Sequence, residues 1–324
     1  MTRLVFLMVL LAGCGSADNW RSLVSGEGTI ERSDGPALYW RALGTGPDTV
    51  VVVHGGVGLH HSYLLEPLGV FLPGRTLIFF DLGGRGRSEA IQDSTRLTAD
   101  NDMADLDAVR RHFNLSRMAV IGHHWGAAVA ARYAVRHAEH VSRLLLLSPF
   151  PVHYSLFFEF ATVRGDTAEF NRGLAAVGGM SSADSVAALC PAHWSLYFTP
   201  WHTDSGTPYS RMGAAMCDAP APALARADFV RRQVQSGLGQ WVWREELNAL
   251  QLPVLIVEGG GVIEIDDAAK RWAQHLPDAR VLLLRRPYLF PWIGDPKRFH
   301  EAGETFLNGA WPSGAEQPPR WAPK

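Results

Sequence analysis

Histidines are the residues of this sequence best placed to do chemistry, because five of them fall in two short glycine-containing stretches. His54, His60 and His61 occur close together, and His123 and His124 are adjacent. Near neutral pH an imidazole can act as a general base, a nucleophile or a metal ligand. No Asp or Glu stands in an evident position to complete a metal site, so we expect none. The alternative role of these rings is to hydrogen-bond loop backbone.

The stretch around His124 has the pattern of a nucleophile elbow. A short apolar run passes through a turn bounded by Gly122 and Gly126 into an alanine-rich helical pattern. The middle residue of such an elbow is normally Ser, Cys or Asp, held in a strained backbone conformation. Histidine is among the few non-glycine residues enriched at positive φ, so His124 can occupy the corner. No Ser or Cys lies between residues 118 and 141, so a shift of register cannot supply the hydroxyl or thiol.

Short apolar runs that alternate with helical patterns predict the framework that would position this turn. Continuously apolar runs suit strands buried on both faces of a parallel sheet. Their alternation with helices is typical of a doubly wound, mostly parallel α/β sheet. The predicted strands are residues 49–53, 76–80, 118–121, 143–147, 254–257 and 281–284, and the predicted helices are residues 100–113, 125–137, 266–275 and 296–307. Segments 28–32 and 37–43 predict an antiparallel hairpin at one edge.

The alternation stops between residues 152 and 248, which are rich in Trp, Pro and Ala. We interpret this segment as a helical lid over the carboxyl ends of the strands, where open α/β sheets bind ligands. The core is then residues 28–151 and 249–309, followed by a C-terminal tail, 310–324. Four tryptophans of this region either line a pocket or fill a small core of the lid itself: Trp194, Trp201, Trp241 and Trp243.

The N-terminus has the pattern of an export signal. Arg3 precedes an apolar run, residues 4–11, that is too short to span a bilayer. The next residues, Leu-Ala-Gly-Cys, resemble the lipobox of a bacterial lipoprotein, which implies cleavage before Cys14 and lipidation of that cysteine. Residues 1–13 would then be the signal peptide and 14–27 a tether to a cell-envelope membrane. The alternative is a plain secretory signal in which Cys14 is incidental.

Export would also decide whether the two remaining cysteines, Cys190 and Cys217, are in an environment that favours a disulfide. In an oxidising compartment an even number of cysteines suggests a disulfide. On the chain-entropy model this bridge would stabilise the fold by roughly 3 kcal/mol. The alternative is two buried free thiols.

Four motifs in the right order resemble the α/β-hydrolase superfamily, in particular its proline-iminopeptidase and epoxide-hydrolase-like branch. The resemblance extends over residues 28–307 and implies a serine hydrolase fold with a lid. The matching segments are His54-Gly55-Gly56-Val57-Gly58 as the oxyanion loop, residues 81–88 (DLGGRGRS) as the DxxGxGxS turn, Gly122-His123-His124-Trp125-Gly126 at the elbow, and Phe290-Pro291-Trp292 with Asp295-Pro296 near the end.

The resemblance fails at all three positions of the catalytic triad. His124 stands at the nucleophile, Leu289 at the histidine that precedes the Phe-Pro-Trp, and Val262 at the acid. Glu264 or Asp266 is an alternative acid if the preceding glycines loop differently. The other position for an acid reads Ser-Pro-Phe, residues 148–150, and His300 belongs to the last helical pattern. Leucine cannot take a proton, so an acid would have no base to orient.

We therefore expect a membrane-tethered α/β-hydrolase-fold pseudoenzyme that binds a small molecule or an envelope protein and needs no cofactor. The ligand site would comprise His54, Gly55, Gly56, His123, His124 and Trp125. Arg85, Arg285 and Arg286 either give its mouth a positive potential or are solvated and paired. A net charge of −2 with 19% charged residues gives no electrostatic footprint for nucleic acid. The alternative is a divergent esterase- or peptidase-like hydrolase that uses His124 or another non-standard group.

Overall fold

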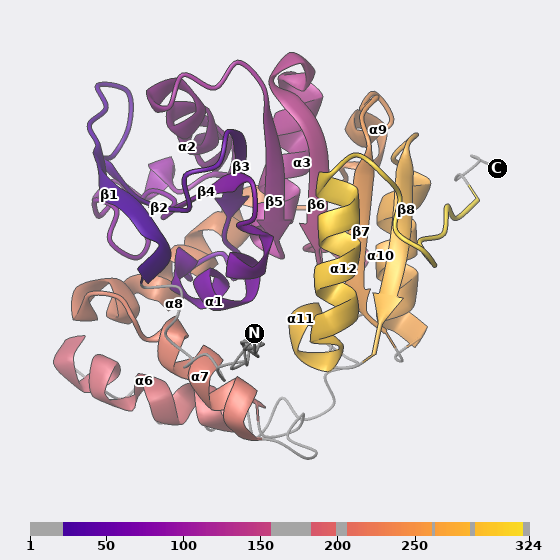
Figure 1. Ribbon diagram of the computed structural model, residues 1–324. Helices are drawn as coiled ribbons and strands as arrows, with labels where there is room; N and C mark the ends of the chain where they lie inside the picture. Colours follow the sequence, from indigo (N-terminus) through magenta and orange to yellow (C-terminus); the bar gives the residue numbers. More distant parts are fainter. Residues whose placement is uncertain (1–21, 157–182, 199–205, 261–262, 286–288, 320–324) are drawn as a thin grey trace, which may run out of the picture.

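The computed structural model describes residues 22–156, 183–198, 206–260, 263–285 and 289–319 (Figure 1). An eight-stranded sheet with the order β1-β2-β4-β3-β5-β6-β7-β8 forms its centre. The six strands β3 to β8 run parallel to one another. At one edge, β1 pairs with β2, and β2 with β4, in antiparallel fashion. The doubly wound α/β sheet and its antiparallel edge hairpin are therefore confirmed.

The six strands predicted from apolar runs lie where expected and are one or two residues longer, whereas the first hairpin strand begins four residues earlier and ends two residues earlier than predicted and the second begins one residue later. They are β1 Val24–Ile30, β2 Leu38–Leu43, β3 Asp48–Val53, β4 Arg75–Phe80, β5 Met118–His123, β6 Val141–Leu147, β7 Val254–Gly259 and β8 Ala279–Leu284. In β3, Val51 and Val53 face one apolar cluster and Val50 and Val52 face the other. Burial on both faces explains why these strands read as continuous apolar runs.

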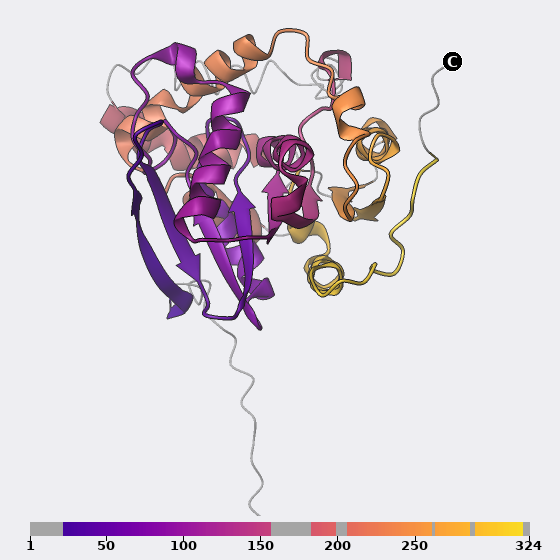
Figure 2. The same cartoon turned by 90° about the horizontal axis from the view of Figure 1, so that it is seen from above.

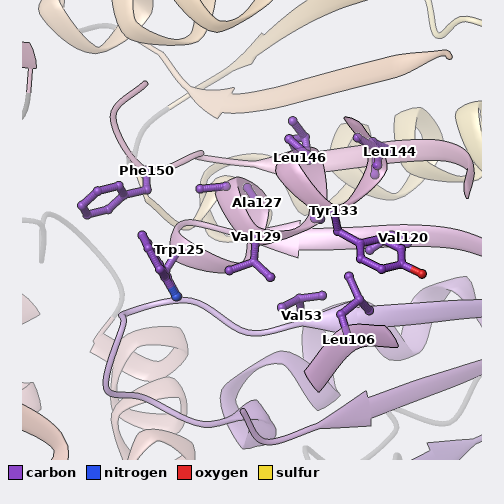
Figure 3. Packing of buried hydrophobic residues seen from close by; sticks show 14 of the residues in the cluster. Val53, Leu106, Val120, Trp125, Ala127, Val129, Tyr133, Leu144, Leu146 and Phe150 are labelled. Atoms are coloured by element: carbon purple, nitrogen blue, oxygen red, sulfur yellow. The ribbon is translucent and has the colours of Figure 1, made fainter. Parts of the chain in front are cut away.

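Helices cover both faces of the sheet (Figure 2). On one face α2 (Ala99–His112), α3 (Trp125–Arg136) and α10 (Ile263–Gln274) enclose the larger apolar cluster, part of which is seen in Figure 3. On the other face α1 (Leu65–Leu68) and α12 (Pro296–Leu307) enclose the second cluster, and α11 (Pro291–Gly294) adjoins it. These two layers place the carboxyl ends of all parallel strands along one edge of the sheet.

Three helices of the predicted lid lie at that edge: α6 Ala183–Phe198, α7 Gly206–Met216 and α8 Ala221–Leu238 (Figure 1). Cys190 of α6 and Cys217, directly after α7, form a disulfide with an S–S length of 2.06 Å. The end of α7 is tied to the core because Arg87 donates to the carbonyl oxygen of Asp218 at 2.6 Å and to its carboxylate at 2.9 Å.

The segment after α8 belongs to the core. His153 and Val242 form a β-bridge, and α9 (Arg244–Leu247) packs beside α3. Trp241 and Trp243 are buried in the larger cluster against Phe150. They do not form a separate core of the lid, because Trp243 packs against Trp272 of α10 within the larger cluster. Trp194 packs against the second cluster, and Trp201 lies outside the described residues.

The outer edge of β8 is partly covered by the tail of the chain. Val281 and Glu316 exchange two backbone hydrogen bonds, N–H of each to C=O of the other, at 2.7 and 2.9 Å. The expected signal peptide and Cys14 lie outside the described residues. Within the described part of the chain, no helix is both long and apolar enough to cross a membrane.

Candidate functional site

The turn between β5 and α3 has the geometry of a nucleophile elbow. His124 occupies its corner with φ 49° and ψ −109°, the positive φ that the sequence pattern predicts. Both flanking glycines are required by close approach: a Cβ on Gly122 would lie 2.5 Å from the carbonyl oxygen of Gly126, and one on Gly126 only 2.1 Å from that of Val53. The backbone N–H of His124 donates to Leu147 at 2.9 Å. The corner is thus fixed by backbone contacts that do not depend on its side chain.

A buried ion pair supports the elbow through Trp125, the residue that follows the corner. The indole N–H of Trp125 donates to Asp102 at 2.7 Å, and Arg85 donates to the two oxygens of that carboxylate at 2.7 and 2.9 Å. Arg85 also donates to the carbonyl oxygen of Val57 at 2.9 Å, which joins the oxyanion loop to the elbow. The proposal that Arg85 contributes to the mouth of a cleft is wrong, because its side chain is fully buried and paired. Arg285 is exposed, and Arg286 lies outside the described residues.

His54 connects the oxyanion loop to the turn after β4, while its expected place in a ligand site stays a prediction. Its Nδ1 donates to the carbonyl oxygen of Gly55 at 3.1 Å, and its Nε2 accepts from the N–H of Leu82 at 3.1 Å. Burial lowers the pKa of His54 to about 3, so the ring is neutral at pH 7. Its two nitrogens are therefore fully used in joining two turns.

His60 and His61 also bond to neighbouring loops. His60 donates through Nε2 to the carbonyl oxygen of Met216 at 3.0 Å, and burial lowers its pKa. His61 contacts Asp81 through both its backbone N–H and Nδ1, each at 2.8 Å. Burial alone would raise the pKa of Asp81, but the charge and hydrogen bonds of His61 lower it below its ordinary value. Within the described residues, no group of three or more His, Cys, Asp or Glu side chains could hold a metal ion.

His123 connects the oxyanion loop to the segment after β8. The N–H of Gly55 donates to the hydroxyl of Tyr63 at 2.8 Å, and this hydroxyl donates to Nδ1 of His123 at 2.7 Å. Nε2 of His123 then donates to the carbonyl oxygen of Leu289 at 2.6 Å. Burial lowers the pKa of His123 to about 4, which keeps this neutral tautomer at pH 7. The backbone N–H of Gly55 is therefore already hydrogen-bonded to Tyr63. The neighbouring Gly56 has a left-handed φ of +74°.

Of the two other residues predicted at triad positions, Leu289 is among the described residues and Val262 is not. Leu289 has a left-handed φ of 68°, and its half-buried side chain packs against the second cluster. Val262 lies outside the described residues, as do the side chains of Glu264 and Asp266. His300 lies in α12, as predicted. The structure therefore places an imidazole at the corner, and a leucine at the residue predicted from the sequence to stand at the position of the base.

Sequence reasoning missed two polar residues at neighbouring strand ends. Ser148 follows β6 with φ 42° and is buried, and its Oγ has no hydrogen-bond partner in the described part of the chain. Glu258 is buried near the end of β7, where it accepts from the N–H of Gly259 at 3.1 Å. Because Leu147 pairs with Val257, the two residues are adjacent in register. A carboxylate within an apolar strand was the signal that could have identified Glu258.

Comparison with known proteins agrees with this geometry. Residues 48–193 match the family model described as the alpha/beta hydrolase fold. The proline iminopeptidase of Saccharolobus solfataricus is 30% identical over 100 residues, which cover 31% of this chain and 32% of the relative. That of Heyndrickxia coagulans is 31% identical over 124 residues, covering 38% of this chain and 43% of the relative. These alignments thus span less than half of each relative's length.

A solved structure extends the similarity to most of the chain. The crystal structure of the proline iminopeptidase of Mycobacterium smegmatis superimposes with a TM-score of 0.66 at 21% identity, covering 87% of this chain and 98% of that protein. At this identity the match concerns the fold.

Proposed function

From its α/β-hydrolase fold, which carries His124 at the elbow and Leu289 at the position of the base, we propose that this protein binds a small molecule without hydrolysing it. The ligand would lie at the carboxyl ends of the parallel strands, the general ligand-binding edge of such sheets. Buried polar groups at this edge, Ser148 and Glu258, would orient it. An envelope protein that docks on the same edge is the alternative partner.

The observation that carries this proposal is the pair of residues at the corner and at the base position. Acyl transfer by this fold needs a hydroxyl at the corner and an imidazole that removes its proton. His124 offers no hydroxyl. Residue 289 presents only its backbone carbonyl, which already accepts a hydrogen bond from His123. These two residues support the proposal because neither side chain supplies the hydroxyl or the base that the reaction needs at its position.

The strained corner favours a second candidate, a hydrolase that uses His124 itself. Strained residues cluster at active sites, and a histidine can act as a nucleophile. Its ring nitrogen would attack the substrate carbonyl and expel the alcohol or amine. Water would then cleave the acyl-imidazole and restore the ring. The proline iminopeptidases to which the chain is similar make a hydrolytic activity of some kind a reasonable competitor.

One comparison of variants separates these candidates. Purified protein and its His124→Ala variant are assayed with p-nitrophenyl acetate and proline p-nitroanilide, and for labelling by a fluorophosphonate. We expect no fluorophosphonate label at the elbow and equal, trace turnover for both proteins, since binding groups alone can leave roughly 10³-fold catalysis over water. Substantial turnover that disappears in His124→Ala would refute the non-hydrolytic proposal and favour the second candidate.

We also propose that a lipid on Cys14 attaches the protein to an envelope membrane. The support is the Leu-Ala-Gly-Cys sequence that ends a short apolar run. Each buried CH₂ group contributes about 0.8 kcal/mol, so several acyl chains attach a protein far more firmly than one. The full-length protein should enter the detergent phase on partitioning, and Cys14→Ser should not. Recovery of unprocessed wild-type protein from the soluble cytoplasm would refute this attachment.

A further inference from the structure

We propose that the disulfide between Cys190 and Cys217 is a redox-sensitive attachment of the lid, whose reduction releases α6 while α7 and α8 stay bound to the core. Such regulation of the lid goes beyond the proposed function, because it holds whether or not a bound ligand is hydrolysed. The three described lid helices lie together at one end of the molecule (Figure 1), but they are attached to the core in different ways.

Two of these helices bury apolar side chains of their own in the core. On α7, Tyr209, Met212 and Met216 are buried in the second apolar cluster. On α8, Val230 and Val234 are buried in the larger cluster. Burial of apolar side chains is the dominant favourable contribution to folding. We therefore expect α7 and α8 to stay in place without the help of the disulfide.

The backbone of α8 also lies directly against the oxyanion loop. A Cβ added to Gly58 would lie 2.1 Å from the carbonyl oxygen of Ala227. The preceding residue of the helix, Arg226, donates to the carbonyl oxygen of Ile91 at 2.6 Å. These contacts attach α8 to two loops of the core, and none of them involves α6.

The turn after α7 is bound to the core on both sides of Cys217. On one side, the buried ring of His60 donates to the carbonyl oxygen of Met216 at 3.0 Å. On the other side, the carbonyl oxygen of Asp218 accepts from the hydroxyl of Ser62 at 3.2 Å, in addition to its guanidinium hydrogen bond. Cys217 is therefore a fixed point of the lid, held by the neighbours that precede and follow it.

The described part of α6 has a much weaker attachment. Among its described side chains, Cys190 is the one that is fully buried, and the others are half-buried or exposed. Trp194 is half-buried where it packs against the second cluster. The main contacts of α6 are with α7 and α8. The disulfide is thus the covalent link that joins this helix to the fixed turn at Cys217.

Reduction of this bond would be carried out by a dithiol, either a small molecule or a thiol–disulfide oxidoreductase. A thiolate of the dithiol attacks Sγ of Cys217, the more exposed of the two cysteines, and Cys190 leaves as a thiolate. The second thiol of the reductant then displaces Cys217 from the mixed disulfide. The reductant ends as a disulfide, and its two protons and two electrons leave Cys190 and Cys217 as thiols.

The first test compares the oxidised full-length protein with the same protein reduced by dithiothreitol under native conditions. Amide hydrogen exchange in α6, residues 183–198, should become at least about tenfold faster on reduction. Exchange in residues 216–218 and 226–234 should stay within about twofold. Unchanged exchange in α6 would overturn the proposal, since the helix would be held without the bridge. Equal acceleration in α6 and α8 would also overturn it, since the bridge would then hold the whole lid.

A pair of variants separates the disulfide from other effects of the reductant. Cys190→Ala leaves the fixed turn without a bridge, so its α6 should exchange as fast as in the reduced wild type, with or without dithiothreitol. Ala188→Ser changes an exposed position of the same helix and should exchange like wild type in both redox states. Slow exchange of α6 in Cys190→Ala, or a further acceleration of that variant by dithiothreitol, would overturn the role of the disulfide.

Discussion

The elbow around His124 and the segment at Leu289 are joined by a hydrogen bond from His123, but they are held in different ways. At the elbow, Gly122 and Gly126 allow the backbones of β5, α3 and β3 to approach closely. The buried ion pair of Arg85 and Asp102 also supports the turn. The segment at Leu289 is held by the side chain of His123 and by ring packing. The geometry of the elbow is part of the packing between sheet and helix, so it persists when the corner residue changes. Because Leu289 is only half-buried, we expect its side chain to contribute less to the stability of the fold than the glycines of the elbow.

The largest effect is expected from adding one methyl group at the elbow, in Gly126→Ala. A Cβ at this position would lie 2.1 Å from the carbonyl oxygen of Val53 and 2.5 Å from that of His54, so the helix and β3 cannot both stay in place. We expect a loss of more than about 4 kcal/mol in the free energy of unfolding, or no folded protein.

The matched control is Gly69→Ala, where an added Cβ meets nothing within 4 Å. Its free energy of unfolding should change by no more than about 1 kcal/mol in urea denaturation. If Gly126→Ala proved as mild as this control, the elbow would not be held by its backbone, and the comparison between the two regions would fail.

A smaller effect concerns the residue that joins the two regions. Burial lowers the pKa of His123 from its ordinary value of 6.5 to about 4. Between these two pH values the ring is protonated in the unfolded chain and neutral in the folded chain. The stability contributed by the neutral ring is complete above pH 6.5 and is lost as the pH falls towards 4. Between pH 7 and pH 5, wild type should lose about 2 kcal/mol more unfolding free energy than His123→Gln.

Asp105 contributes an opposite pH dependence to both proteins. Burial and the nearby charge of Asp102 raise its pKa to about 6, so its contribution changes in the opposite direction and favours the folded state at low pH. Since Asp105 is present in both proteins, it cancels from the difference. Urea unfolding at the two pH values measures that difference, and identical pH dependence in both proteins would show that His123 is not held in its neutral form.

The smallest effect is expected at the base position. Leu289 is only half-buried, and its hydrogen bond to His123 uses the backbone carbonyl, so Leu289→Ala should cost about 1 kcal/mol. Leu65→Ala, in the same apolar cluster but fully buried, should cost about 3 kcal/mol. Thermal and urea unfolding of the two variants would show whether position 289 contributes as little to stability as the comparison requires.

The framework could be predicted because each part of it is encoded locally. Continuous apolar runs such as the one that ends at Val53 identify strands buried on both faces, and α12 has the bounds that the sequence predicts, 296–307. The glycines of the elbow identify its turn for the same reason. Composition alone could not place Trp241 and Trp243, which belong to the predicted lid segment and pack in the larger cluster.

The contacts within the site could not be predicted, because they join residues far apart in the chain. The side chains of Tyr63 and His123 and the backbone carbonyl of Leu289 meet although they are far apart in the sequence, and no local pattern indicates this network. The sequence leaves open whether Arg85 lies at the mouth of the ligand site or is paired, because its partner Asp102 lies on a different element. Motifs indicate where a site forms, whereas hydrogen-bond partners depend on how the elements pack.

The pairing of Glu316 with Val281 has a consequence for the assembly of the chain with copies of itself. An exposed edge strand offers unpaired N–H and C=O groups that can template intermolecular sheets. In this molecule the tail occupies those groups at the centre of β8, the last strand of the sheet. We therefore expect a chain shortened before Glu316 to self-associate more readily than the full-length chain, because the N–H and C=O of Val281 would be left unpaired at the sheet edge.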